Sequence, residues 1–363
     1  MAEVTKEQIE AAIKGYIEPH MEKNLVDAKC VKAMNIDGGS VSVTVELGFP
    51  SDGIKQALAA AVKDCVASVD GVSSVEVNVG WKVVAHSVQK SLKPIDNVKN
   101  IIAIASGKGG VGKSTTAVNM ALALAAEGAK VGILDADIYG PSQPRMLGVS
   151  GQPESKDGKS LEPMEAYGLQ AMSIGFLVDE ETPMIWRGPM VTQALEQLLN
   201  DTNWASLDYL IIDLPPGTGD TQLTLAQKVP VSGAVIVTTP QDIALLDARK
   251  GFKMFEKVEV PVLGIVENMS THICSNCNHE EHIFGEGGGK RMAEQYGVDF
   301  LGGLPLDIRI REETDGGKPT VVAEPDSRIS QIYREISRNT TAKLALQAKN
   351  YASKFPNIVI QNN

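Results

Sequence analysis

The chain has 363 residues, of which 43% are hydrophobic and 22% charged, and its formal net charge is −11. This length predicts two domains, each able to bury its own core. An acidic chain without a lysine or arginine cluster argues against nonspecific nucleic-acid binding as its main task, and no apolar stretch is long enough to span a bilayer. Its four cysteines are too few for a disulfide scaffold, so we expect a protein of the reducing cytoplasm without membrane or nucleic-acid partners.

Residues 1–85 predict a small α+β domain. Thr5 is a suitable N-cap for a helix, and residues 53–69 have apolar residues at helical spacing. Residues 40–47 and 75–79 alternate between apolar and polar side chains, as half-buried strands do. The expected order is therefore helix, strand, helix, strand.

Residues 86–98 are polar, include Pro94, and predict a linker. From residue 99 to 363, strand and helix signals alternate, which predicts an α/β domain with a doubly wound, mostly parallel sheet. The expected strands are apolar segments, as parallel strands covered on both faces should be: residues 101–105, 130–135, 169–174, 209–213, 234–239, 262–267 and 298–301. The tail after residue 340 predicts a weakly amphipathic helix without the dense basic face of a membrane anchor.

A phosphate-binding loop follows the first of these strands and precedes a helical segment that starts at Thr115. It consists of Gly107, Lys108, Gly109, Gly110, Val111, Gly112, Lys113 and Ser114. Glycines let successive N–H groups point at phosphates, and the helix N-terminus adds partial positive charge. We expect Lys113 to contact the β- and γ-phosphates of a bound nucleotide and the Ser114 hydroxyl to ligate Mg²⁺. Lys108 has no obvious role on its own phosphates; it either reaches a nucleotide bound by a facing subunit or is a solvated loop lysine.

Carboxylates end two of the expected strands. Asp135 and Asp137 follow residues 131–134, and Asp213 follows residues 210–212. The carboxyl ends of parallel strands face the ligand crevice, and nucleotide hydrolysis needs groups that orient water and hold Mg²⁺. Either carboxylate alone could instead cap the next helix.

Cys274 and Cys277 form a Cys-x-x-Cys pair in a polar loop, at a spacing that lets two thiolates share one metal centre. Two thiolates complete neither a tetrahedral zinc site nor a cubane cluster, but a symmetric dimer would supply the four that a [4Fe–4S] cluster requires. A zinc site within one chain, completed by His279 and His282, and a redox disulfide pair are the alternatives. Cys30 and Cys65 fall in apolar-patterned segments and predict packing roles.

Taken together, these motifs resemble those of the Mrp/ApbC family of iron–sulfur cluster carriers. The resemblance covers nearly the whole chain: a loop with a second lysine like the deviant Walker A motif of MinD/ParA-type ATPases, residues 135–142 (DADIYGPS), 187–190 (RGPM), 213–220 (DLPPGTGD), 268–270 (NMS) with the cysteine pair, and 283–289 (IFGEGGG). Residues 1–85 are similar to the MIP18-like domain of iron–sulfur assembly proteins, with Glu18-Pro19 as its acidic-Pro turn. Phe49-Pro50 stands where many members carry Cys-Pro, so thiol chemistry is not expected in this domain.

The resemblance implies a cytoplasmic homodimer that holds a labile cluster and passes it to apoproteins, coupled to ATP binding and slow hydrolysis. It implies that Lys108 acts across the dimer, that Asp137 positions water, that Asp213 is the Walker B carboxylate, and that Asn268 contacts adenine. Two other functions compete with this one. A spatial-organising ATPase would need a basic surface or an amphipathic tail, and a metal-trafficking ATPase would use the cysteine pair for a zinc-type site.

Overall fold

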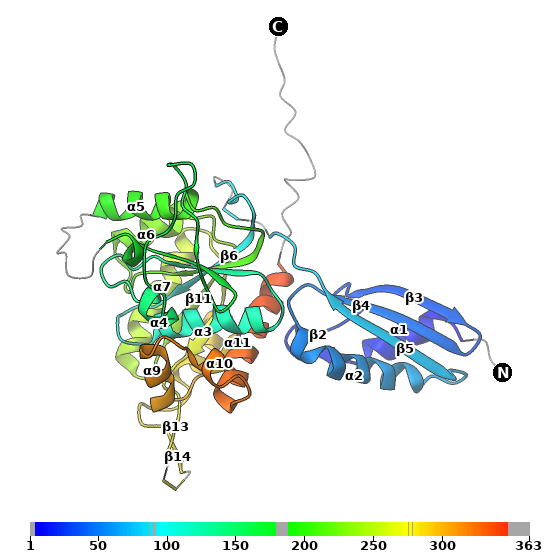
Figure 1. Cartoon of the computed structure of the whole chain (residues 1–363). Coiled ribbons are helices and arrows are strands. Elements are labelled where there is room, and N and C mark those ends of the chain that lie inside the picture. The colour runs from blue at the N-terminus through cyan, green and yellow to red at the C-terminus, as the bar shows by residue number, and fades with distance from the viewer. Residues whose placement is uncertain are drawn as a thin grey trace.

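The computed structural model describes residues 4–86, 88–89, 92–178, 188–274, 276–277 and 279–347. Figure 1 shows a small N-terminal domain beside a larger domain that contains the rest of the described chain. Arg187 of the 187–190 motif and the predicted tail beyond residue 347 lie outside the described residues.

The small domain is a three-stranded sheet covered by two helices. The sheet order is β3 (Val31–Asp37), β4 (Ser40–Leu47), β5 (Ser74–Trp81), and the helices are α1 (Lys6–Lys14) and α2 (Lys55–Ala67). Thr5 caps α1 through a capping box with Gln8, which confirms the predicted helix start. β4 matches its prediction because Val41, Val43 and Val45 alternate into the core.

The predicted order was incomplete, because it missed β3, which pairs antiparallel with β4. Only one side of this edge strand has a partner, and its residues are half-buried or exposed. Its apolar alternation is therefore weak. A short ladder between β1 (Ile17–Glu18) and β2 (Lys23–Asn24) was not predicted either.

The large domain contains the predicted doubly wound sheet. Its eight strands lie in the order β15-β12-β11-β6-β10-β7-β9-β8, and only β8–β9 is antiparallel. The strands are β6 (Val98–Ala105), β7 (Val131–Asp135), β8 (Met164–Ala166), β9 (Leu169–Ser173), β10 (Leu207–Asp213), β11 (Gly233–Thr238), β12 (Val262–Glu267) and β15 (Phe300–Gly303). All the predicted strands of this sheet form, and β8 was missed at an edge.

Helices cover both faces of this sheet (Figure 1). The described helices are α3 (Lys113–Ala126), α4 (Gln143–Leu147), α5 (Gly188–Asn200), α6 (Asp220–Lys228), α7 (Asp242–Lys257), α8 (Gly288–Tyr296), α9 (Ile308–Asp315), α10 (Thr320–Ala323) and α11 (Arg328–Ala345). Alternate residues of a strand point to opposite faces. Ile102 and Ile104 of β6 therefore pack beneath α3 and α11, whereas Ile101 and Ala103 pack toward the helices of the other face.

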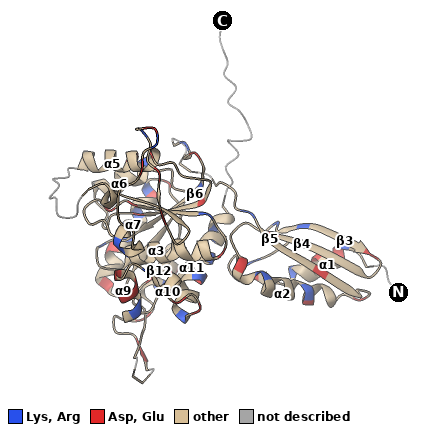
Figure 2. Cartoon of the chain, viewed as in Figure 1, with Lys and Arg blue, Asp and Glu red and all other residues tan. Residues whose placement is uncertain are grey.

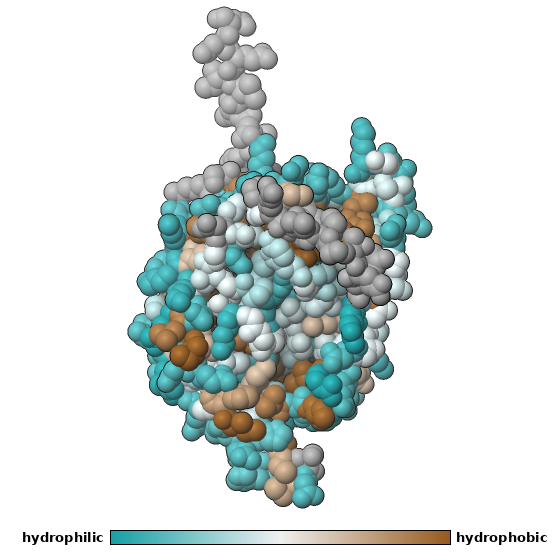
Figure 3. All heavy atoms as spheres, turned by 90° about the vertical axis from the view of Figure 1, so that its left-hand side faces the viewer, coloured by the Kyte–Doolittle hydropathy of each residue, from teal (hydrophilic) through white to brown (hydrophobic). Residues whose placement is uncertain are grey.

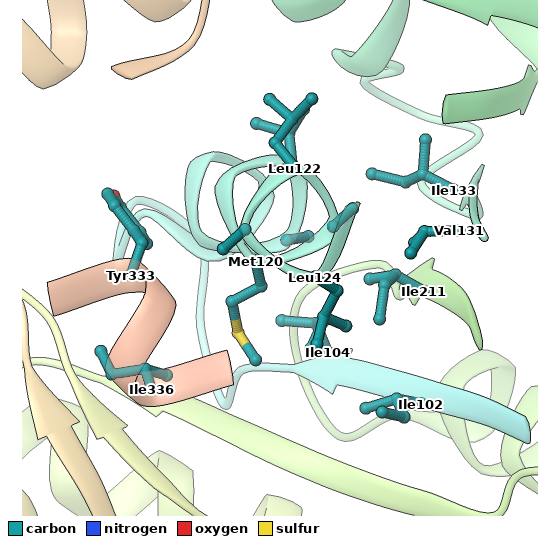
Figure 4. Packing of buried hydrophobic residues seen from close by; sticks show 14 of the residues in the cluster. Ile102, Ile104, Met120, Leu122, Leu124, Val131, Ile133, Ile211, Tyr333 and Ile336 are labelled. Carbon is teal, nitrogen blue, oxygen red and sulfur yellow. The ribbon is translucent and has the colours of Figure 1, made fainter. Parts of the chain in front are cut away.

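Figure 4 shows the packing around α3, where Leu124 lies beside the strand residues Ile104 and Ile211 and Tyr333 approaches from α11. Burying each large apolar side chain contributes about 1.5–3 kcal/mol. This packing fixes α3, and with it the loop at its N-terminus, relative to the sheet.

Charged groups join the two domains at the other end of α3. Glu127, the C-cap residue of α3, is fully buried. Its carboxylate accepts hydrogen bonds from Arg338 Nη2 at 2.6 Å and from the Gly53 amide of the small domain at 2.8 Å. His20 contacts Glu335 of α11 at 3.3 Å. The small domain therefore docks on α3 and α11 through the hydrogen bond from the Gly53 amide to Glu127 and the contact of His20 with Glu335.

Elsewhere the surface is mixed in charge and hydropathy. Figure 2 shows basic and acidic residues interspersed over both domains, and the face in Figure 3 carries separate apolar groups among polar atoms. None of the helices in the described ranges is both long and apolar enough to traverse a bilayer.

Candidate functional site

The phosphate-binding loop connects β6 to α3 at the carboxyl edge of the sheet. Gly110 and Gly112 have φ of +79° and +80°, a conformation that side chains rarely adopt. A Cβ on Gly107 would lie 2.1 Å from the carbonyl carbon of Asp247 in α7. The backbone can therefore follow this path only with glycine at these positions, and Thr115 lies in the first turn of the helix that follows.

Lys113 and Asp213 meet in this site, as their positions in the sequence predict. Lys113 Nζ forms an ion pair with Asp213 Oδ1 and lies 3.2 Å from Ser114 Oγ. The Lys113 side chain is only 6% exposed and that of Asp213 is fully buried. In this conformation the lysine neutralises the buried carboxylate.

Asp135 organises the segment that follows β7. Its buried carboxylate accepts hydrogen bonds from the amides of Asp137, Ser142 and Gln143 at 3.1, 2.9 and 3.0 Å. Burial, with the nearby charge of Asp213, raises the pKa of Asp135 to about 7. All these partners are in the chain itself, so Asp135 acts as an anchor for residues 137–143.

Asp137 lies in the anchored segment, close enough to the site to interact with its charges. Burial raises the pKa of Asp137, while the charge of Lys113 acts in the opposite direction. Its role in positioning water stays a prediction.

Gln143 was not recognised in the sequence, although its side chain is in the centre of the site. Its Nε2 donates to Asp213 Oδ2 at 3.0 Å and to the Ser114 carbonyl at 3.2 Å. Gln143 Oε1 and Ser142 Oγ are buried and have no hydrogen-bond partner among the described residues. Ser142 ends the motif of residues 135–142, and only proximity to that motif could have singled out Gln143.

The same groups fit a magnesium ion. Mg²⁺ prefers hard oxygen ligands and retains several waters, so it is usually bound through one or two protein oxygens. The Ser114 hydroxyl and the Asp213 carboxylate lie together here, and the Gln143 amide, whose Oε1 is buried and unpartnered among the described residues, contacts Asp213. The residues present therefore match the predicted Mg²⁺ site.

Asn268, at the end of β12, contacts the phosphate-binding loop. Its Nδ2 donates to the Val111 carbonyl at 2.8 Å, and its Oδ1 accepts from the Met269 amide at 2.9 Å. A Cβ on Gly112 would lie 2.1 Å from Nδ2. The side chain thus reaches the nucleotide site, and its contact with adenine stays a prediction.

Lys108 differs from Lys113 in its surroundings. The loop backbone is fixed there, because Ser106 Oγ donates to the Lys108 carbonyl at 2.9 Å. Within the described ranges, the Lys108 ammonium group has no hydrogen-bond or ion-pair partner. Its charge is therefore available for a group outside its own loop.

The two cysteines lie at the end of a hairpin that projects from the large domain (Figure 1). The hairpin pairs β13 (His272–Ile273) with β14 (Glu280–Glu281), and the Cys274 amide donates to the His279 carbonyl at 2.9 Å. Cys277 is exposed and Cys274 partly exposed. Hydrogen bonds from the backbone of Asn276 and Cys277, then from the Cys277 thiol, lower the pKa of Cys274 and favour its thiolate.

Among the described residues, the histidines of the zinc alternative are not gathered with the cysteine pair into a group of three ligands. His282 Nδ1 is hydrogen-bonded to the Ser270 carbonyl at 2.8 Å. Across the part of the chain that is described, no three His, Cys, Asp or Glu side chains come close enough to hold a metal ion. Each chain therefore brings two thiols to one exposed position.

Fold and site together define a P-loop NTPase of the MinD/ParA type with an added cysteine hairpin. The chain belongs to the ParA family described as NUBPL iron-transfer P-loop NTPase, whose profile matches residues 97–341. A second profile, described as iron-sulfur cluster assembly protein, matches residues 6–79.

Curated relatives carry corresponding names. An "iron-sulfur cluster carrier protein" of Haemophilus influenzae is 51% identical over 94% of this chain and 92% of its own length. The protein of the same name in Escherichia coli is 49% identical over 96% of this chain and 94% of its own. The mouse "iron-sulfur cluster transfer protein NUBPL" is 52% identical over 69% of this chain and 80% of its own.

Solved structures agree with the fold of the large domain. A nucleotide-binding protein from Archaeoglobus fulgidus in complex with ADP has a TM-score of 0.56 and 39% identity, covering 64% of this chain and 90% of that one. The cell division ATPase MinD of Pyrococcus furiosus has a TM-score of 0.50 at 22% identity, covering 66% of this chain and 97% of that one, which supports the fold alone.

Proposed function

We propose that this protein is an iron–sulfur cluster carrier in which two copies of the chain hold one [4Fe–4S] cluster between their Cys274 and Cys277 pairs. The observation that carries the proposal is the exposed hairpin, where two thiols come together without a third metal ligand among the described residues. A cubane needs four ligands, and two-fold symmetry supplies the second pair. The names of the curated relatives support the cluster as cargo.

An exposed position suits a carrier that must release its cargo to an apoprotein. A cluster bound by residues at the end of a hairpin is accessible to the thiols of a recipient. The partly exposed Cys274, with its lowered pKa, is a thiolate ligand that a competing thiolate can displace. The same chemistry requires the reducing environment of the cytoplasm, where we place the protein.

We propose further that the nucleotide site binds and slowly hydrolyses ATP with Mg²⁺, and that this cycle is coupled to cluster transfer. When bound, Mg²⁺ would neutralise phosphate charge, held through Ser114 and, by way of water, Asp213. Lys113 would move from Asp213 to the β- and γ-phosphates, and Asp137 would orient the attacking water. Lys108, whose ammonium group lacks a partner in the described parts of its own chain, would contact the nucleotide of the facing copy.

Anaerobic reconstitution with iron and sulfide tests the cluster proposal. We expect about four irons and four sulfides per dimer, with Cys274→Ser or Cys277→Ser each abolishing binding. Cys65→Ser is the matched control, because Cys65 is also a partly exposed free thiol but lies in the small domain. One zinc per monomer that remains bound when the dimer dissociates would contradict the proposal and establish a site within one chain.

A further inference from the structure

We propose that Gln143 is a positioning residue for Asp213 and that, with Ser142, it helps to retain Mg²⁺ in the nucleotide site. Gln143 is the first residue of α4 and its side chain is only 1% exposed. The inference rests on the proposed binding of Mg²⁺ and ATP, and concerns how this chain prepares that site.

The hydrogen bonds of Gln143 fix the orientation of its amide. Nε2 faces two acceptors, Asp213 Oδ2 at 3.0 Å and the Ser114 carbonyl at 3.2 Å. A flipped amide would put an oxygen against both acceptors, which is unfavourable. Oε1 is bonded to the same carbon as Nε2, so it lies in the same site, close to the residues that would hold Mg²⁺.

Gln143 keeps Asp213 in place when Lys113 leaves it. Asp213 Oδ1 pairs with Lys113 and Oδ2 with Gln143, and the carboxylate is fully buried. When Lys113 turns toward a phosphate, Oδ1 loses its partner, and a buried carboxylate without partners is unstable. The amide of Gln143 still holds Oδ2, so the freed Oδ1 stays oriented toward the position of Mg²⁺ and its water.

The unpartnered oxygens point to a ligand that the protein itself does not supply. Buried polar atoms nearly always have a hydrogen-bond partner, so orphaned ones need an explanation. Gln143 Oε1 and Ser142 Oγ are both orphaned among the described residues. Oε1 belongs to the amide that contacts Asp213 and Ser114, and Ser142 directly precedes Gln143 in the chain. Water bound to Mg²⁺ is a strong donor and would satisfy an oxygen of this kind.

The main chain of these two residues is already secured independently. Asp135 Oδ2 accepts from the amides of Ser142 and Gln143 at 2.9 and 3.0 Å. Side-chain replacement leaves these main-chain bonds in place. An effect of Gln143→Met can therefore be assigned to the lost amide group, because methionine preserves the length and most of the volume of the side chain.

Calorimetric titration of the full-length protein with ATP, with and without Mg²⁺, tests the proposal. We expect Gln143→Met to reduce the gain in affinity on adding Mg²⁺ by about 10-fold or more, as loss of an outer-shell partner does. Ser142→Ala should reduce that gain in the same direction by a smaller factor. The matched control is Gln170→Met, since Gln170 Nε2 donates only to the Ala205 carbonyl at 3.1 Å.

The proposal is overturned if Gln143→Met gains as much affinity for ATP from Mg²⁺ as the Gln170→Met control does. An equal loss of affinity with and without Mg²⁺ is one form of this result and indicates a purely structural role. If Gln143→Met does not fold, an unchanged gain in Ser142→Ala decides against the proposal. Wild-type protein that gains no affinity from Mg²⁺ would instead contradict the proposed nucleotide function itself.

Discussion

Replacing Arg338 by methionine should destabilise the junction of α3 and α11 on which the small domain docks. Methionine keeps an apolar stem of similar length but removes the guanidinium group that lies 2.6 Å from the buried carboxylate of Glu127. Arg338 also donates to Glu335 at 2.8 Å. The variant therefore leaves a buried charge without its nearest cation.

The contacts that remain set the expected size of this effect. Removing one partner of a buried ion pair generally costs about 3–5 kcal/mol. Glu127 keeps the Gly53 amide at 2.8 Å and Arg334 Nε at 3.3 Å. We therefore expect the lower end of that range, a loss of about 3 kcal/mol in the free energy of unfolding.

Urea unfolding followed by tryptophan fluorescence measures this loss. Trp81 reports on the junction because its Nε1 donates to Asp52 at 2.7 Å, beside Gly53. The control is Arg311→Met, whose side chain is 63% exposed, so that its loss should be within about 0.5 kcal/mol. The double variant Glu127→Gln/Arg338→Met should lose less than the sum of the two single losses. Equal losses for Arg338→Met and Arg311→Met, or strict additivity in the double variant, would refute the reasoning.

Three further predictions concern the nucleotide site and the pH dependence of stability. Lys113→Ala removes the charge that balances the β- and γ-phosphates, so ATP turnover should fall by several orders of magnitude; turnover equal to the wild type would contradict the assignment. Lys108→Ala should impair hydrolysis while leaving ATP binding by the monomer intact, and mixed dimers with a hydrolysis-dead copy should show whether each site depends on its neighbour's lysine. Burial alone would lower the pKa of His20, but hydrogen bonds to Glu18 and Glu335 raise it from 6.5 to about 9. The resulting stabilisation, at most about 3 kcal/mol, should be complete below pH 6.5 and lost as the pH rises through 9, and His20→Gln should flatten that profile in urea titrations.

The sequence alone was enough to predict the elements that depend on a short stretch of neighbouring residues, namely the phosphate-binding loop and the buried strands. The glycine-rich loop between an apolar strand and a helix was recognisable because its backbone path depends on glycines only a few residues apart. The buried strands of the large sheet were recognisable as continuous apolar runs because both of their faces are covered. Edge strands β3 and β8 carry a weaker pattern, since a single neighbour and partial exposure constrain their residues less.

The tertiary structure decided which polar groups meet. Gln143 is 70 residues from Asp213 in sequence, and Arg338 is 211 residues from Glu127. Neither Gln143 nor Arg338 belongs to a local motif, and glutamine and arginine usually lie on the protein surface. Strand order and the packing of α3 against α11 determine which carboxylate each donor contacts. These contacts could not be predicted from the sequence, because the partners are far apart in the chain and no local pattern links them.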